Sequence, residues 1–390
     1  MSGGIQAVTM PKFGLAMTEG AVAAWHVAEG QTITEGQEIA DIETAKITNG
    51  YETPIAGVLR RKVVADGEVV PVGTLIAVVA PESVDDAEID AFIATFQSAE
   101  PQEADGQEAL AAGSAPEPER VAVAGRTVRR LRAGPSEKAS ASSASVLIHG
   151  FGGDLNSWMF TQPVLAEDRH CDAVDLPNHG ESTKDPALAS LDDLAAAMAD
   201  YLDAAELERV HLVGHSLGGA IAARLAAGRP EVVASVTLIA PAGMGDTINA
   251  DYVDGFIEAS RRKALTPVLG LLFADPGLVT RAMVDEVVRF KRLDGVAEAL
   301  KALRDACFPD GRQRIAIRSD LEALACPVHI LWGEKDAILP VDQANNAPPA
   351  ARVHRLPGVG HMAHMEAARE TTRLIRDAMA EADRPSTDRF

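Results

Sequence analysis

Hydrophobic and polar positions divide the chain into two parts with different periods. Up to about residue 80, short apolar runs such as "AVAAW" and "LIAVVA" are separated by glycines, which is typical of short β-strands joined by tight turns. Beyond about residue 120, strand-like runs such as "SVLIHG" and "RVHLVG" alternate with stretches of helical apolar period, for example "LDDLAAAMADYL". The pattern predicts an all-β unit followed by an α/β unit with a mostly parallel sheet.

The first part contains an internal repeat. The segment "VAEGQTITEGQEIADIE" aligns with "VADGEVVPVGTLIAVVA" at a constant offset of 37 residues, which carries Val27 onto Val64 and Gly30 onto Gly67. Repeated segments of this kind fold as equivalent structural units. We therefore expect two similar β halves around a pseudo-twofold axis, joined by a hairpin that contains "ETAKI" and has Lys46 at its tip.

Twin β halves with a lysine at the connecting tip resemble the lipoyl and biotinyl carrier domains, in which that lysine is amidated with a long cofactor arm. Biotinyl domains flank the lysine with methionines, whereas Ala45 and Ile47 flank Lys46, and this favours lipoyl. Ala45 departs from the aspartate that many lipoyl domains have, while Glu43 and Thr44 agree with them. The resemblance implies a small all-β lipoyl-type barrel with a lipoyl group covalently on Lys46. The alternative is that Lys46 is a solvated surface charge.

Changes in composition along the chain predict three segments. A lipoyl carrier domain is expected over residues 1–82, a short helix and flexible acidic linker over 83–120, and the α/β domain over 121–390. The linker expectation comes from "QSAEPQEADGQEALAAGSAPEPER", which is rich in Ala, Glu, Pro and Gly and lacks an apolar period. A flexible chain of about 20 residues has an end-to-end distance on the order of 25 Å, enough for one domain to visit the other.

The second unit contains a candidate nucleophile. The run "GHSLG" around Ser216 fits G-x-S-x-G between an apolar strand and a small-residue helix. Serine is a poor nucleophile at neutral pH unless a base takes its proton, so Ser216 requires a later histidine held by a carboxylate. Asp336 follows the strand-like run "HILWG", and His361 lies in the glycine-flanked loop "PGVGHM". We expect Ser216, Asp336 and His361 to be the nucleophile, the orienting acid and the base.

Two of these three positions have rivals. Glu334 lies two residues before Asp336, but Asp336 better matches a position at the end of a strand. His354 and His364 lie close to His361, and we interpret both as surface or packing residues.

A second glycine-rich turn, "HGFGG", ends another buried strand. Its position predicts an oxyanion hole in which the backbone N–H groups of Phe151 and Leu217 stabilise a tetrahedral intermediate. With this turn included, the chain from about Val121 to its end resembles the α/β-hydrolase family. The resemblance implies an α/β-hydrolase-fold domain with a helical lid at about residues 244–323 that decides the substrate.

Five basic residues of the lid stand out in an acidic chain, and they admit two interpretations. The ordinary one is a solvated face. The other is a site for the phosphates of a CoA-like acceptor, formed by Arg261, Arg262, Lys263, Lys291 and Arg292.

Charge and composition narrow the partners and the compartment. The 36 basic and 57 acidic residues give a formal charge of -21, which argues against nucleic acid or an anionic membrane as a partner. The 3 cysteines are widely and irregularly spaced, so neither a disulfide framework nor a CxxC metal site is readable, and no metal is expected. No apolar run reaches the roughly 18–20 residues of a membrane span. We expect a cytoplasmic protein.

A carrier arm joined by a tether to an acyl-transfer triad is explained if the arm delivers an acyl thioester. The tether then raises the effective concentration of the thioester at the triad. Across almost the whole chain this layout resembles the dihydrolipoamide acetyltransferase component of bacterial acetoin dehydrogenase complexes. The resemblance implies transfer of an acetyl group from dihydrolipoamide to CoA. It also implies a homo-oligomer whose partners are a thiamine-dependent dehydrogenase component and dihydrolipoamide dehydrogenase.

Two other hypotheses remain open. The triad motifs do not distinguish CoA from water as the acceptor, so the second unit could be a hydrolase of an ester or carbon–carbon bond fused to a lipoyl carrier. A second unit that is an inactive scaffold fits less well, because all three triad positions are filled.

Overall fold

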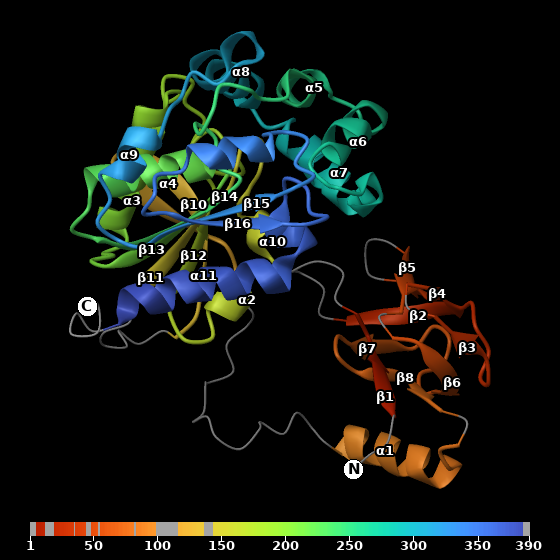
Figure 1. Ribbon diagram of the computed structural model, residues 1–390. Helices are drawn as coiled ribbons and strands as arrows, with labels where there is room; N and C mark the ends of the chain where they lie inside the picture. The colour runs from red at the N-terminus through yellow and green to blue at the C-terminus, as the bar shows by residue number, and fades with distance from the viewer. Residues whose placement is uncertain are drawn as a thin grey trace. The chain divides into compact units, whose positions relative to one another are not determined.

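The computed structural model consists of two compact units, Met1–Ala112 and Gly113–Phe390 (Figure 1). The residues that it describes are 5–11, 19–34, 36–43, 48–53, 55–81, 83–98, 116–135 and 143–384. Every helix within these ranges is too short or too polar to cross a membrane.

The first unit consists of two four-stranded antiparallel sheets. One sheet has the strand order β1-β8-β6-β3 and the other has the order β5-β4-β2-β7. The strands are β1 (Gln6–Thr9), β2 (Glu19–Trp25), β3 (Thr32–Ile33), β4 (Glu38–Glu43), β5 (Thr48–Glu52), β6 (Gly57–Lys62), β7 (Val69–Pro71) and β8 (Leu75–Ala80).

The two sheets reflect the sequence repeat. The 37-residue offset carries β4 onto β8, residue for residue, and carries β2 onto β6 and β3 onto β7. Equivalent strands hold equivalent places in the two sheet orders, which confirms the predicted pair of β halves. Apolar side chains from both copies, including Ile39, Ile42 and Ile76, are fully buried in one shared core.

The strands β4 and β5 flank the predicted carrier lysine. They pair antiparallel with Glu43 opposite Thr48, and Lys46 itself lies outside the described residues. At the other end of this unit, β8 leads to α1 (Asp86–Ser98) (Figure 1). Ile89 of α1 packs with Leu75 and Val78 of β8, as expected for a short helix that belongs to this unit. Most of the predicted linker, residues 99–115, also lies outside the described residues.

The second unit is built on an eight-stranded sheet of order β16-β15-β14-β13-β11-β12-β10-β9. Strands β11 to β16 are parallel, while β9 and β10 extend one edge in antiparallel pairing, so the predicted mostly parallel sheet is confirmed. The strands are β9 (Glu119–Val123), β10 (Arg126–Ala133), β11 (Ala144–Ile148), β12 (Cys171–Val174), β13 (Val210–His215), β14 (Val233–Ile239), β15 (Val328–Gly333) and β16 (Arg352–Leu356).

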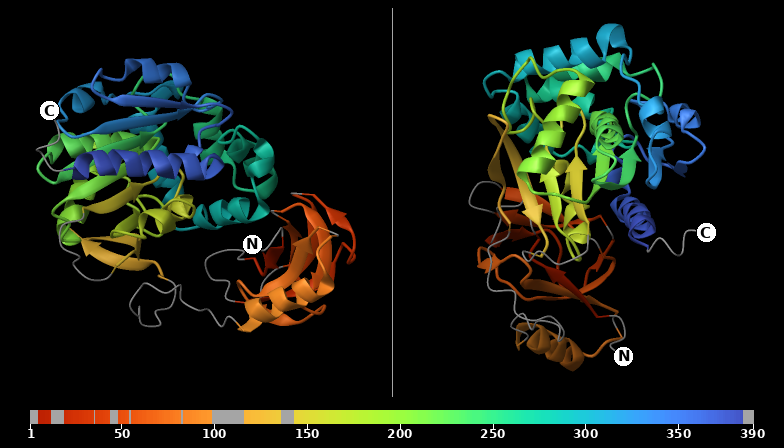
Figure 2. Two further views of the ribbon diagram at one scale, coloured as in Figure 1. Left: turned by 60° about the horizontal axis from the view of Figure 1, so that its bottom comes forward. Right: turned by 90° about the vertical axis from the view of Figure 1, so that its left-hand side faces the viewer.

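Helices cover both faces of this sheet. Because side chains alternate along a strand, Val146 and Ile148 of β11 join the core beneath α3 (Leu191–Ala204) and α4 (Leu217–Gly228). Leu147 points the other way and joins the core formed with α11 (Ala368–Asp383) (Figure 1, Figure 2). Strands buried on both faces account for the continuous apolar runs in the sequence.

Four helices of nine residues or more follow β14 within the segment expected to form a lid, ahead of the short helix α9 (Arg318–Glu322). Two of the basic residues there have structural partners: the ammonium group of Lys291 donates to the carbonyl groups at the end of α5, including that of Ile257 at 3.0 Å, and Arg262 pairs with Asp285. The remaining three, Arg261, Lys263 and Arg292, are exposed. The helices are α5 (Ala250–Glu258), α6 (Arg262–Gly270), α7 (Arg281–Phe290) and α8 (Val296–Cys307).

Candidate active site

Ser216 lies at a sharp turn between β13 and α4. Its backbone has φ 54° and ψ -117°, a conformation that costs a non-glycine residue about 1–3 kcal/mol. The glycines on either side leave room for this turn: a Cβ on Gly214 would lie 2.3 Å from the carbonyl oxygen of Gly218, and a Cβ on Gly218 would lie 2.2 Å from that of Ile148. Close backbone packing therefore explains the glycines of the motif.

His361 and Asp336 form a buried hydrogen-bonded pair. His361 Nδ1 is 2.8 Å from Asp336 Oδ2, and the two side chains are 2% and 0% exposed. Asp336 Oδ1 accepts hydrogen bonds from the backbone N–H groups of Ile338 at 2.8 Å and Leu339 at 2.9 Å, which fix the carboxylate. Since a carboxylate can only accept, the proton of the imidazole is assigned to Nδ1, and Nε2 is left as the basic nitrogen.

The rival residues occupy other surroundings. Glu334 is exposed, and His354 lies on β16 with its Nε2 3.3 Å from His329 Nδ1. His364 is fully buried, with its ring centroid 4.5 Å from that of Trp158. Burial lowers the pKa of His364 to about 3, so its ring is neutral at pH 7. The structure thus pairs His361 with Asp336 and leaves Glu334 exposed.

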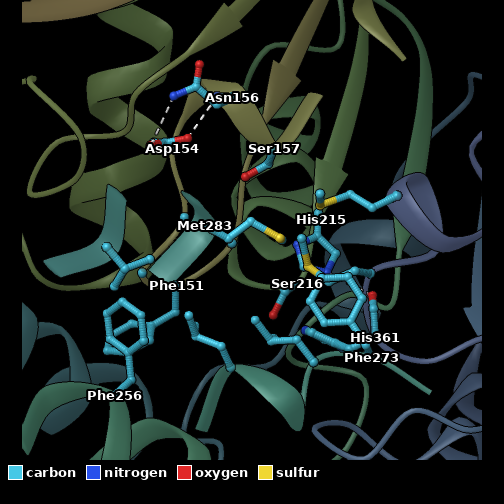
Figure 3. Close-up of a pocket in the computed structure, with 18 of the residues that line it drawn as sticks. Phe151, Asp154, Asn156, Ser157, His215, Ser216, Phe256, Phe273, Met283 and His361 are labelled. Atoms are coloured by element: carbon cyan, nitrogen blue, oxygen red, sulfur yellow. Dashed lines mark hydrogen bonds between the residues drawn. The ribbon is translucent and has the colours of Figure 1, made fainter. Parts of the chain in front are cut away.

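A pocket lies beside Ser216 and His361, and its lining is almost entirely apolar or neutral (Figure 3). Among the described residues that line it, the charged side chains are both acidic, Asp154 and Glu286. Burial raises the pKa of Asp154 to about 6. The large apolar side chains around the pocket are Phe151, Met159, Phe256, Leu269, Leu272, Phe273, Met283, Val287, Met362 and Met365.

Both residues expected to form an oxyanion hole border the nucleophile. Phe151 lines the pocket together with Ser216, and Leu217 is the first residue of α4, so its N–H has no partner within the helix. The Tyr252 hydroxyl donates to the carbonyl oxygen of Phe151 at 3.1 Å and holds that part of the turn. Tyr252 was missed in the sequence, because nothing in the helical stretch "DYVDGF" marks it.

His215 was also missed, since the residue before the serine is a free position in the motif. Its Nε2 is 3.0 Å from the backbone oxygen of His361. Burial lowers the pKa of His215 well below its usual value, so its ring is neutral. The ring therefore donates a hydrogen bond to this oxygen and restrains the loop that carries His361.

The lid is hydrogen-bonded to the same loop. The N–H of His361 donates to the carbonyl oxygen of Leu272 at 3.0 Å. The carboxylate of Glu366 accepts from Ala274 N at 2.8 Å and from Gly360 N at 3.0 Å. The lid segment after α6 is therefore bonded to the loop that carries His361 directly, through Leu272, and indirectly, through the Glu366 carboxylate that bridges Ala274 and Gly360.

Comparison with known proteins reveals matches to both units. The alpha/beta hydrolase fold family matches residues 146–368, and the biotin-requiring enzyme family matches residues 6–79. Over 95% of its length the chain is 44% identical to the dihydrolipoyllysine-residue acetyltransferase component of the acetoin cleaving system of Pseudomonas putida, of which it covers 97%. It is 42% identical to the component of the same name from Cupriavidus necator, of which it covers 96%.

Among solved structures, the second unit resembles a meta-cleavage product hydrolase from Pseudomonas fluorescens with a TM-score of 0.61 and 22% identity, covering 68% of this chain and 98% of that one. A bacterial membrane phospholipase A gives a TM-score of 0.60 at 24% identity, covering 70% and 88%. At these identities the likeness shows the fold alone.

Proposed function

The chain belongs to the family of dihydrolipoyllysine-residue acetyltransferase components of acetoin-cleaving systems, and we propose that it transfers an acetyl group from a lipoyl arm on Lys46 to CoA through Ser216, His361 and Asp336. The observation that carries the proposal is the buried hydrogen bond of 2.8 Å between His361 and Asp336, on a loop that lines the pocket beside Ser216.

When bound, the lipoyl group supplies the thiol that carries the acetyl group. In the first half of the reaction Ser216 Oγ attacks the thioester carbonyl, while His361 Nε2 takes the serine proton. Backbone N–H groups of Phe151 and Leu217 stabilise the oxyanion. As the carbon–sulfur bond breaks, His361 returns the proton to the leaving sulfur, and the acetyl group remains as an ester on Ser216.

The second half repeats these steps with a different nucleophile. His361 takes the proton of the CoA thiol, whose sulfur attacks the acetyl ester of Ser216. The carbon–oxygen bond then breaks, His361 returns the proton to Ser216 Oγ, and acetyl-CoA leaves. Asp336 keeps the proton on Nδ1 throughout, and it stabilises the imidazolium that forms in each half.

The pocket lining fits the two thiols. The thiol ends of dihydrolipoamide and of CoA are neutral chains, and the described lining residues include no lysine or arginine that could pair with a phosphate. The phosphates of CoA would therefore remain outside the pocket. Arg261, Lys263 and Arg292 of the lid are exposed and are candidates for binding them. A pocket of this kind admits a thiol arm while holding little water near the acyl carbon.

As a component of an acetoin-cleaving system, the chain works with other enzymes. We propose two partner enzymes for it. A thiamine-dependent dehydrogenase component would load the lipoyl arm with the acetyl group, and dihydrolipoamide dehydrogenase would reoxidise the arm. The three cysteines are unpaired and Cys171 and Cys307 are buried, which is compatible with a reducing cytoplasm.

The product ratio tests the proposed acceptor. The full chain is mixed with acetyl-dihydrolipoamide and saturating CoA, and acetyl-CoA and free acetate are both quantified. Transfer predicts that acetyl-CoA forms faster than acetate. If acetate dominates at saturating CoA, water is the acceptor and the protein is a hydrolase fused to a carrier.

A further inference from the structure

Three side chains of the first unit converge on its outer surface, away from the residues discussed so far. His26 follows β2, while Glu38 and Asp41 belong to β4. His26 Nε2 lies 3.2 Å from Asp41 Oδ2 and 3.6 Å from Glu38 Oε1. One ligand atom from each residue lies within 4.8 Å of the other two. We call these three residues the His26 cluster.

A β-bulge brings the two carboxylates together. Residues three apart in a regular strand point to opposite faces of the sheet, so Glu38 and Asp41 would normally be separated. The pairing of β4 with β5 shifts between Glu38 and Ala40, which leaves Ile39 as an extra residue. The bulge lets Glu38 and Asp41 share the outer face, and bulges commonly re-aim side chains in this way at functional sites.

A glycine on the neighbouring strand provides the space for the cluster. Gly50 of β5 pairs with Asp41. A Cβ on Gly50 would lie 2.4 Å from Glu38 Oε2. Any other residue at position 50 would displace the Glu38 carboxylate, so the convergence depends on this glycine.

The two separations from His26 to the carboxylates match those between ligands of one metal ion, and the ligand atoms of Glu38 and Asp41 lie within 4.8 Å of each other. Zinc bonds to imidazole nitrogen and carboxylate oxygen are about 2.0–2.2 Å long, so two ligands of a tetrahedral ion are roughly 3.3 Å apart. The contacts of 3.2 Å and 3.6 Å agree with this value. The cluster offers a divalent cation one imidazole nitrogen and two carboxylate oxygens, whose two negative charges balance its charge.

We propose that His26, Glu38 and Asp41 bind a divalent transition-metal ion of the zinc class, with water completing its coordination. An imidazole with two carboxylates suits zinc or cobalt better than magnesium or calcium, which prefer oxygen ligands only. The three side chains are 38%, 57% and 34% exposed, so the ion can enter from solvent. Bound there, it crosslinks β4 to the end of β2, and β4 is the strand that leads into the segment containing Lys46.

Co²⁺ is the probe for this site, because its d–d absorption reports coordination directly. The full chain is treated with chelator, desalted and titrated with Co²⁺, followed by competition with Zn²⁺ monitored through loss of the cobalt spectrum. We expect one equivalent bound to the native chain. Removing a ligand in His26→Gln or Asp41→Asn should weaken binding by at least about tenfold, since changes that only orient a ligand already cost 10–100-fold.

Two further variants complete the test. Gly50→Ala keeps all three ligands but displaces Glu38, so it should weaken binding as well, while His170→Gln in the second unit should bind like the native chain. Thermal unfolding of each variant checks that the first unit still folds. Undiminished binding in folded His26→Gln, or no binding to the native chain at 100 μM Co²⁺, about the range of weak metal sites, overturns the proposal.

Discussion

The proposed working groups of the two units belong to different kinds of segment. In the first, the predicted carrier lysine lies outside the described residues, in the four-residue segment that joins β4 to β5. In the second, the His361 and Asp336 side chains are 2% and 0% exposed. A carrier must leave its own unit to work, whereas an acyl-transfer site must exclude water until a thiol arrives. The first function should therefore depend on one residue, and the second on many contacts.

Lys46→Arg should give the largest effect. Arginine keeps the charge but offers no amine for amidation, so acetyl transfer driven by the dehydrogenase component should fall to background. Transfer from free acetyl-dihydrolipoamide to CoA should be unchanged, because the second unit is untouched. The measurement compares the rates of the variant and the native chain in the two assays, and intact-protein mass shows whether each chain is lipoylated.

Lys301→Arg, at an exposed lysine of α8, is the matched control and should leave both assays unchanged. Normal coupled transfer by Lys46→Arg would contradict the division of roles between the units.

Ser216→Ala should lower both assays by roughly 10³-fold or more, the scale of loss on removing a triad nucleophile. Lipoylation of Lys46 should remain complete, which separates this variant from the first. Initial rates of acetyl-CoA formation measure the loss, and Ser319→Ala, at an exposed serine of α9 (Arg318–Glu322), serves as the control. Transfer at the native rate by Ser216→Ala would place the chemistry elsewhere.

Tyr252→Phe tests how far the second unit depends on contacts around the triad. It removes the hydroxyl that donates to Phe151, so the turn of the oxyanion hole loses one restraint. We expect kcat to fall about tenfold, less than the 10²–10³-fold cost of deleting an oxyanion donor itself, with KM little changed.

Tyr201→Phe also removes a buried hydroxyl, one that donates to Asp172 at 2.6 Å away from the pocket. A fall in kcat of the same size in both variants would show that the loss reflects general destabilisation rather than position.

His364→Phe should give the smallest effect on activity and a measurable effect on stability. The folded pKa of about 3 lies below the usual 6.5, so between these values only the unfolded chain binds this proton, and stability falls as pH falls. From pH 7 to pH 5 this group removes about 2 kcal/mol. Phenylalanine should remove that part of the decrease, as urea unfolding at both pH values would show. An equal decrease in the native chain and the variant would assign the acid sensitivity to other groups.

The features predicted from sequence are those that local rules determine. The repeat at a fixed offset predicted the paired sheets, and the glycines around Ser216 predicted the sharp turn at this residue. Both features depend on residues that are neighbours in the chain. The pairing of His361 with Asp336 followed from chain order, although 25 residues separate them. By contrast, β16 was missed, since its sequence "RVHRL" is polar along one sheet edge and lacks the apolar run of its neighbours.

Residues missed at the site share another property. Tyr252, His215 and Glu366 act through backbone oxygen or nitrogen atoms that lie far away in sequence. A side chain bonded to a distant backbone group leaves no pattern of its own, because any residue can supply that group. Only the fold reveals such contacts.

The twofold relation between the halves of the first unit affects the distance that an acetyl group carried on Lys46 could reach. The chain leaves this unit through β8 and α1, and β8 is the symmetry copy of β4, the strand that precedes Lys46. Strand β5 and helix α1 therefore lie at opposite ends of this unit (Figure 1). With the proposed arm on the segment before β5 and the predicted linker after α1, the length of the unit adds to the distance that the acetyl group can reach.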